Sequence, residues 1–238
     1  MLDGLYSGAA ALDTLAKQQE VISSNLMHAN SSAHRRIQAG VKQRFEIDNL
    51  DANIDLGPEI ETYRSDFQPG RQVPTGRPLD VAVAGDGFLV FDDGGNDFFT
   101  RNGRLFRNPE SNLLVNEEGF PIQGESGPIT IDSNIGDQDV TIATDGTVSA
   151  KGNILGKLKT VAFEDNHTLI PVGIAGFIPS SRSVESERSV QVAQFQHELS
   201  NVQPVSELVA LIVNNRQYEA VQKATRALSE SLRDHIRE

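Results

Sequence analysis

Residues 204–237 read PVSELVALIVNNRQYEAVQKATRALSESLRDHIR, a stretch without glycine and with a proline only at its start. A proline suits the first turn of a helix, because the N–H that it lacks has no partner there. Apolar residues recur at steps of three and four, which indicates an amphipathic helix. At about 1.5 Å per residue, a helix from Pro204 to Arg237 is about 50 Å long, which exceeds what most globular domains can cover.

A second helix is predicted at the N-terminus, from about Asp3 to Ala29, with Asp3 as its N-cap. The polar run Asn30-Ser31-Ser32 ends it, because such side chains compete for backbone hydrogen bonds. Steps of three and four again form a heptad seam. The seam consists of Leu5, Gly8, Leu12, Leu15, Gln19, Ile22 and Leu26, with Gln19 as its polar member.

Both apolar surfaces need burial, so we expect the two terminal helices to pair as a coiled-coil-like hairpin. One partner helix covers only part of each surface, and the remaining apolar area is a candidate subunit interface. From the heptad alone, packing within one domain and packing between molecules are equally supported.

The middle of the chain has a different pattern, in which short runs of β-branched and aromatic residues alternate with turns such as Gly85-Asp86-Gly87 and Asn102-Gly103. This pattern is typical of antiparallel strands. The predicted strands are Leu79–Val83, Phe88–Phe91, Phe98–Thr100, Leu113–Val115, Val140–Ala143, Thr147–Ala150 and Leu158–Phe163. The predicted fold class is therefore α+β, with an antiparallel all-β domain inserted between the two terminal helices.

Four regions are expected along the chain. The N-terminal helix occupies residues 1–30, and an extended linking arm without a clear period occupies residues 31–70. The β domain occupies residues 71–185, and a return segment with the long C-terminal helix occupies residues 186–238.

Composition excludes several classes of protein and site. The 238 residues contain no cysteine, so disulfides, thiolate nucleophiles and cysteine metal sites are absent. The five histidines do not follow an HExxH pattern, and we expect no metal and no other cofactor. A net charge of −12 argues against a nucleic-acid partner. The excess of acids lies in the middle of the chain, since residues 204–238 carry as many bases as acids.

The sequence also lacks targeting signals of two kinds. No apolar run approaches the roughly 18 residues needed to cross a bilayer, so membrane insertion is not expected. The N-terminus has neither the basic region nor the continuous apolar stretch of a signal peptide. We therefore expect a protein that stays in the cytosol or leaves it by a route without a cleavable signal.

Several segments resemble the flagellar axial proteins of the rod and hook. The N-terminal helix ends in SSNLMHAN (23–30), where that family has an Asn-Asn-Leu-Ala-Asn-like signature. The central signature is present as TGRPLDVAVAGDGF (75–88), followed by FTRNG (99–103) and DGTV (145–148). The C-terminal signature is present as ELSNV (198–202) and RQYEA (216–220). These matches occur in order and cover nearly the whole chain.

The chain departs from the family pattern in two places. Ala33-His34-Arg35 stands where the family usually has Gly-Phe-Lys. Phe195 and His197 stand where a Gly and a Leu are expected. Both departures lie where a helix would meet the arm or the return segment.

The resemblance implies a structural subunit of the flagellar basal-body rod. A hook subunit usually carries an additional outer β domain, for which this chain has no room, and the short arm resembles the proximal F-type more than the distal G-type. A distal rod or hook-type axial subunit is the alternative. The family implies terminal helices that pack in a torque-transmitting tube, with copies of itself and other rod proteins as partners. It also implies export by the flagellar type III apparatus to the periplasmic rod.

The expected assembly interface takes residues from both helices and from the polar signatures. It comprises Leu5, Leu12, Leu15, Ile22, Asn25, Leu26, Asn30, Asn201, Val205, Leu208, Ile212, Arg216, Tyr218 and Glu219. For Arg216, Tyr218 and Glu219, a solvated helix face is an equally supported interpretation.

The central motifs have structural interpretations. Asp80 is expected to accept hydrogen bonds at a turn, and Arg101 to pair with an acid of the β domain. Gly85, Gly87 and Gly103 are expected to provide backbone freedom at tight turns. Asn201, with its neighbour Ser200, is expected to cap or orient the C-terminal helix.

Two other function classes stay open from the sequence alone. A wall hydrolase would use paired carboxylates, for which Asp80, Asp86, Asp92 and Asp93 are candidates, but no histidine or nucleophile motif lies nearby. A calcium-binding adhesive module would use the run 92–97, which lacks the spacing and the final glutamate of an EF-hand loop. We expect no catalytic residues.

Overall fold

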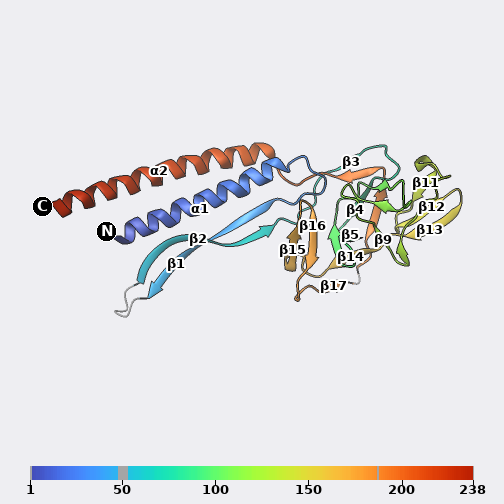
Figure 1. The fold of residues 1–238 in the computed structure, drawn as a ribbon, viewed down its shortest axis with the longest axis horizontal. Coiled ribbons are helices and arrows are strands. Elements are labelled where there is room, and N and C mark those ends of the chain that lie inside the picture. Colours follow the sequence, from blue (N-terminus) through green and yellow to red (C-terminus); the bar gives the residue numbers. More distant parts are fainter. Residues whose placement is uncertain (1, 48–52, 187, 238) are drawn as a thin grey trace. The chain divides into compact units, whose positions relative to one another are not determined.

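The computed structural model describes residues 2–47, 53–186 and 188–237, which form two compact units (Figure 1). The helical unit comprises Met1–Ala29, Arg36–Asp66 and Val202–Glu238, and the β unit comprises Asn30–Arg35 and Phe67–Asn201. The predicted α+β class, with helices at both ends and an antiparallel β domain between them, is confirmed. The finer division into four regions stays a prediction.

The helical unit contains α1 (Leu2–Met27), β1 (Ile37–Ile47), β2 (Asn53–Ser65) and α2 (Pro204–Arg237). Helix α2 has the predicted bounds, and α1 ends within two residues of its predicted end. Most of the segment expected as an extended arm is a long antiparallel hairpin of β1 and β2, paired from Ile37 with Ser65 to Ile47 with Asn53. This hairpin lies within the helical unit, and its pairing includes two register shifts, after Gly40 and after Arg44.

Helices α1 and α2 lie side by side (Figure 1). The Asn214 side chain of α2 donates a hydrogen bond to the Leu15 carbonyl of α1 at 3.0 Å. A Cβ atom added to Gly8 would lie 2.6 Å from the Thr225 hydroxyl, so the small residue permits a close approach. The pairing of the two ends as a hairpin agrees with the sequence, whereas coiled-coil geometry stays a prediction.

The β unit is built from short strands. These are β3 (Gln72–Pro74), β4 (Val81–Ala84), β5 (Gly87–Asp92), β6 (Asp97–Thr100), β7 (Phe106–Arg107), β8 (Leu114–Val115), β9 (Gln123–Gly124), β10 (Gly127–Pro128), β11 (Val140–Ile142), β12 (Thr147–Ala150), β13 (Asn153–Lys157), β14 (Thr160–Phe163), β15 (Leu169–Val172), β16 (Gly176–Pro179), β17 (Glu185–Ser186), β18 (Gln191–Gln194) and β19 (Gln196–Glu198). The largest sheet has the order β15-β16-β6-β5-β14-β17, and its pairs are antiparallel.

Strand β5 divides the core of the β unit into two clusters. Leu89 and Phe91 point to one face and pack with the buried side chains of β4, β11 and β12. Phe88 and Val90 point to the other face, where they pack with a cluster of aromatic residues that includes Phe99. Because both faces of this strand are buried, its sequence is a continuous apolar run, as the motif at 88–91 indicated.

The glycines of the central motif differ in what they provide. Gly85 has a φ of 79° and provides the predicted backbone freedom at a turn. The same interpretation is wrong for Gly87 and Gly103, which do not have left-handed backbones. A Cβ on Gly103 would lie 1.8 Å from the Val81 carbonyl oxygen, so this glycine is needed for close packing of two backbone segments.

Across the described residues, neither helix is both long and apolar enough to cross a membrane.

Candidate assembly surface

Polar side chains hold the interior of the helical unit together. The Asn25 side chain, near the end of α1, donates to the Ile37 carbonyl and accepts from the Ile37 N–H, both at 2.9 Å. Thr14 donates to the Pro58 carbonyl at 2.7 Å, which fastens the middle of α1 to β2. Asn25 and Thr14 are buried, so these bonds fix the hairpin against α1 with little competition from water.

Helix α2 also turns polar residues inward. Glu207 is 1% exposed and its carboxylate forms an ion pair with the Arg36 guanidinium, at the start of the segment that leads into β1. Asn214, two turns further along α2, is also buried, and its side-chain amide donates a hydrogen bond to the backbone of α1. The inner face of this half of α2 is therefore anchored by a carboxylate and an amide, as well as by Leu211, which is half-buried.

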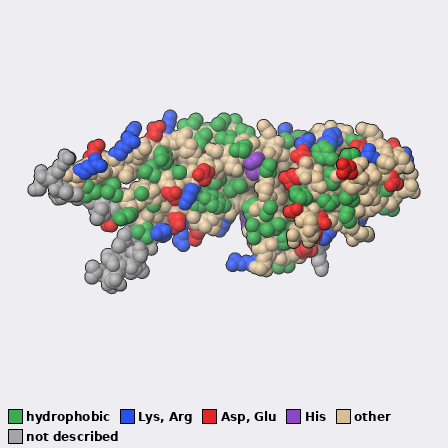
Figure 2. Space-filling view, in the orientation of Figure 1, with side chains coloured by type: hydrophobic (Ala, Val, Ile, Leu, Met, Phe, Trp, Pro, Cys, Tyr) green, Lys and Arg blue, Asp and Glu red, His purple; other side chains and the backbone are tan. Residues whose placement is uncertain are grey.

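The opposite face of the same half of α2 is apolar and exposed. Its members are spaced by three and four residues, as one face of a helix requires. They are Val205, Leu208, Val209, Ile212 and Val213, with exposed fractions of 75%, 51%, 56%, 54% and 48%. We call this surface the outer stripe, and Figure 2 shows hydrophobic side chains gathered over the first turns of α2.

The predicted interface residues occupy three kinds of position. Val205, Leu208 and Ile212 belong to the outer stripe. The seam residues of α1 are half-buried within the helical unit: Leu5, Leu12, Leu15, Ile22 and Leu26. The polar candidates are dispersed: Asn25 is buried, Tyr218 is half-buried, and Asn30, Arg216 and Glu219 are exposed.

Asn201 belongs to the β unit, where its side-chain amide donates to the Gln68 carbonyl at 3.0 Å. The interface prediction omitted Val209, Val213 and Glu207. The spacing of apolar residues in α2 signalled the two valines, whereas nothing in the sequence distinguished Glu207 from the exposed acids of the same helix.

The β unit contains a second buried glutamate, Glu198, at the end of β19. Its Oε1 accepts from the Gly70 N–H at 2.7 Å and pairs with Arg35 at 2.8 Å. Its Oε2 accepts from Arg101 Nε at 2.7 Å. Arg101 also donates to the carbonyls of Val83, Gly85 and Gly87. Arg101 thus pairs with an acid of the β domain, as expected, in a buried position.

The carboxylates considered for catalysis or calcium binding have structural partners. Asp80 is buried and pairs with Arg77 at 3.2 Å, and Asp97 pairs with Lys159 at 2.8 Å. The run 92–97 forms the turn between β5 and β6, where Asp92 accepts from the Gly95 N–H at 2.5 Å. Within the described residues, no three His, Asp or Glu side chains gather as a metal site would require.

Two family models match parts of the chain. One is described as the flagellar hook protein FlgE/F/G D1 domain and matches residues 82–150, within the β unit. The other is described as the flagellar basal body rod FlgEFG protein C-terminal and matches residues 194–237, which include all of α2. The outer stripe therefore lies in the segment that the second model covers.

Whole-length relatives agree with these matches. The chain is 30% identical to the flagellar basal-body rod protein FlgF of Salmonella typhimurium, over 95% of this chain and 94% of that protein. The chain belongs to the flagellar basal-body rod family. FlgF of Caulobacter vibrioides is also 30% identical, over 94% of this chain and 92% of its own length. FlgG of Agrobacterium fabrum, another member of the rod family, is 29% identical over 90% of this chain and 91% of its own. The resemblance to the rod family, and to its F-type, is confirmed.

Proposed function

We propose that this chain is a structural subunit of the proximal flagellar basal-body rod and that it assembles through the outer stripe of α2. Membership of a family of structural rod proteins supports this function and gives no support to a wall hydrolase or a calcium-binding adhesive module. The main observation in support of the proposal is that the polar and apolar faces of α2 are the reverse of those of an ordinary surface helix. Its inner face holds buried Glu207 and Asn214, whereas its apolar residues face outward.

The outer stripe is energetically sufficient for an interface. Complete burial of a Val, Leu or Ile side chain contributes about 1.5–3 kcal/mol. Between 48% and 75% of the surface of each of the five residues is still available for burial, so covering the stripe contributes about 5 kcal/mol before the costs of association. An isolated subunit gains nothing from the exposed part of these side chains, and a contiguous exposed apolar surface is the usual sign of a surface that another molecule covers.

The mechanism that follows is mechanical. Contacts between unlike faces of successive subunits produce an open helical assembly when their rotation does not close a ring. Many such contacts make a stiff shaft that transmits torque. The partners are copies of this chain and other rod proteins, and the site of action is the periplasmic part of the basal body. The proposal also includes export by the flagellar type III apparatus; it requires no cofactor, nucleic acid or membrane insertion.

The proposal is tested by replacing both Leu208 and Ile212 with serine in cells whose motility depends on this chain. Both side chains are half exposed in the subunit, so the melting temperature of the purified variant should stay within about 3 °C of wild type, because exposed substitutions change stability little. The variant should be at least ten-fold depleted from isolated basal bodies, and swimming should be lost.

The matched control is Tyr63→Ser, which removes an apolar side chain that is 55% exposed on β2, outside the stripe. The control should incorporate and swim like wild type. Normal incorporation of the double serine variant would refute assembly through the outer stripe.

A further inference from the structure

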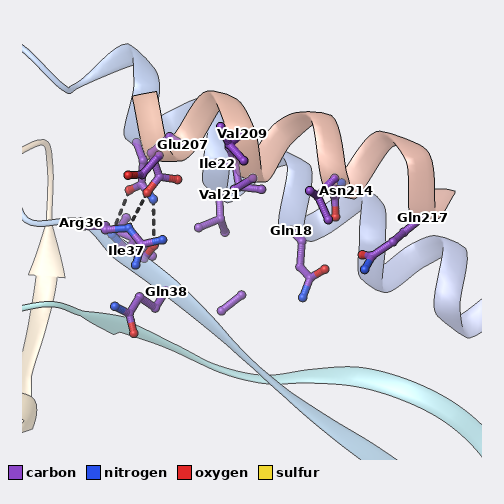
Figure 3. A pocket seen from close by; sticks show the side chains of 15 residues that line it. Gln18, Val21, Ile22, Arg36, Ile37, Gln38, Glu207, Val209, Asn214 and Gln217 are labelled. Carbon is purple, nitrogen blue, oxygen red and sulfur yellow. Dashed lines mark hydrogen bonds and ion pairs between the residues drawn. The ribbon is translucent and has the colours of Figure 1, made fainter. Parts of the chain in front are cut away.

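A groove of about 570 Å³ lies beside the outer stripe, between α1, β1 and α2 of the helical unit (Figure 3). Its walls combine the aliphatic residues Val209 and Val213 with amides such as Gln18 and Gln217. Among its lining residues, which all belong to the described part of the chain, Arg36 and Glu207 are the charged ones. The groove is thus a mostly neutral space, and its two charged residues form an ion pair with each other.

Among the described residues, only one oxygen of the Glu207 carboxylate has a hydrogen-bond partner. Glu207 Oε1 accepts a hydrogen bond from Arg36 Nε, as Figure 3 shows. Glu207 Oε2 has no hydrogen-bond partner among the described residues. It is also buried, since Glu207 as a whole is only 1% exposed. Leaving a buried acceptor unsatisfied costs about 1–3 kcal/mol, and more when the group is charged. Glu207, which lines the groove, therefore has one acceptor oxygen without a hydrogen-bond donor among the described residues.

Glu198 of the β unit shows the completed form of the same arrangement. Arg35 forms an ion pair with one of its oxygens at 2.8 Å, and Arg101 forms an ion pair with the other at 2.7 Å. Both arginines come from the same unit of the chain as Glu198. At Glu207 one basic side chain, Arg36, is in place, and the helical unit provides none for the second oxygen among its described residues.

We propose that the groove receives a lysine or arginine side chain from an adjacent axial subunit, whose cationic group binds Glu207 Oε2. This inference rests on the proposed function, since it assumes that a neighbouring subunit covers the outer stripe. Val209 and Val213 belong both to the outer stripe and to the groove wall, so a subunit that covers the stripe also reaches the groove. The aliphatic part of a lysine or arginine side chain can pack against the two valines, and its cationic group can donate a charge-assisted hydrogen bond to the buried carboxylate.

The first test replaces Glu207 with glutamine. The amide oxygen can still accept from Arg36, so the purified monomer should melt within about 5 °C of wild type. The variant should be at least ten-fold depleted from isolated basal bodies, because the incoming cation loses its partner. Glu230→Gln, which neutralises an exposed acid on the same helix outside the expected interface, is the control and should incorporate normally. Normal incorporation of Glu207→Gln would overturn the proposal.

The second test does not depend on the folding of a charge variant. A photoreactive benzoylphenylalanine replaces Gln38, which lines the groove from β1, or Lys42, which is exposed on the same strand outside the groove lining. After irradiation of isolated basal bodies, mass spectrometry should find the Gln38 probe joined to a peptide of another axial subunit that contains Lys or Arg at or next to the joined position. The Lys42 probe should give no such product.

A third probe at Leu208 separates the two proposals. Products between subunits from Leu208 but none from Gln38 would refute the groove as a binding site and leave assembly through the outer stripe intact. Products from neither position would refute both. Products from Gln38 that lack a basic residue near the joined position would also overturn the role assigned to Glu207.

Discussion

Replacing Glu198 with alanine is expected to destabilise the β unit strongly, because two buried arginines lose their shared counter-charge. The side chain of Glu198 is fully buried, and those of Arg35 and Arg101 are 1% and 5% exposed. The Gly70 N–H also loses its acceptor. Removing one partner of a buried ion pair typically costs about 3–5 kcal/mol, since the remaining charge stays in a low-dielectric interior. Solvent screening gives little relief at this depth.

The expected shift in melting temperature follows from the size of the unit. For a domain of this length, 1 kcal/mol corresponds to roughly 3 °C, so Glu198→Ala should melt about 10–15 °C below wild type. Glu198→Gln keeps the shape and an acceptor oxygen but loses the charge, and its melting temperature should lie between the two. The assay is thermal unfolding of the purified chain, followed by far-ultraviolet circular dichroism.

A surface ion pair of the same unit provides the control. Glu117 pairs with Arg104 at 2.6 Å, but their side chains are 43% and 37% exposed. Such pairs contribute about 0–1 kcal/mol, so Glu117→Ala should melt within about 3 °C of wild type. If Glu198→Ala shifted the midpoint no more than Glu117→Ala does, the reasoning about the buried network would be refuted.

Two further perturbations test local features of the β unit. Phe195 has a φ of 62°, so Phe195→Gly should be more stable than Phe195→Ala by about 1 kcal/mol, the reverse of the usual order; equal stabilities in urea unfolding would contradict a left-handed backbone there. Burial lowers the pKa of His197 from its usual 6.5, so the folded state takes up its proton less readily than the unfolded state. Stability should therefore fall as the pH drops below about 6.5, and His197→Gln should weaken this dependence; identical pH profiles would contradict it.

The sequence predicts well those elements whose residue pattern follows from local rules or from burial of the element itself. Helix α2 begins at Pro204 and runs without glycine, so its bounds follow from local rules. Strand β5 is apolar throughout because both of its faces are covered. The β1–β2 hairpin was expected only as an extended arm, and residues 41–44 of it are exposed on both faces, so burial imposes no alternation there.

Other features depend on residues that are distant in the sequence. Strand β15 includes Pro171, which argues against a strand in isolation, but β15 lies at the edge of its sheet, where proline is tolerated. The sequence predicted an acid partner for Arg101 without identifying Glu198, which is 97 positions away. At Phe195 and Ala33, where the family pattern has glycine, the backbone has positive φ values of 62° and 57°. The two departures therefore place residues with a Cβ atom in the left-handed region, which glycine adopts more readily.

The two units differ in how far their apolar and charged side chains are buried and paired within the subunit. The core of the β unit is buried within that unit, as Leu89 and Phe88 on the two faces of β5 show, and its buried carboxylate Glu198 pairs with arginines of the same unit. The first half of α2 exposes five large aliphatic residues, and the described part of the chain provides no hydrogen-bond donor for one oxygen of Glu207. The hydrophobic and electrostatic contributions missing from the isolated helical unit are those that a neighbouring subunit would add. Binding that occurs only to the folded state stabilises that state in proportion to partner concentration and affinity. The helical unit should therefore gain stability on assembly.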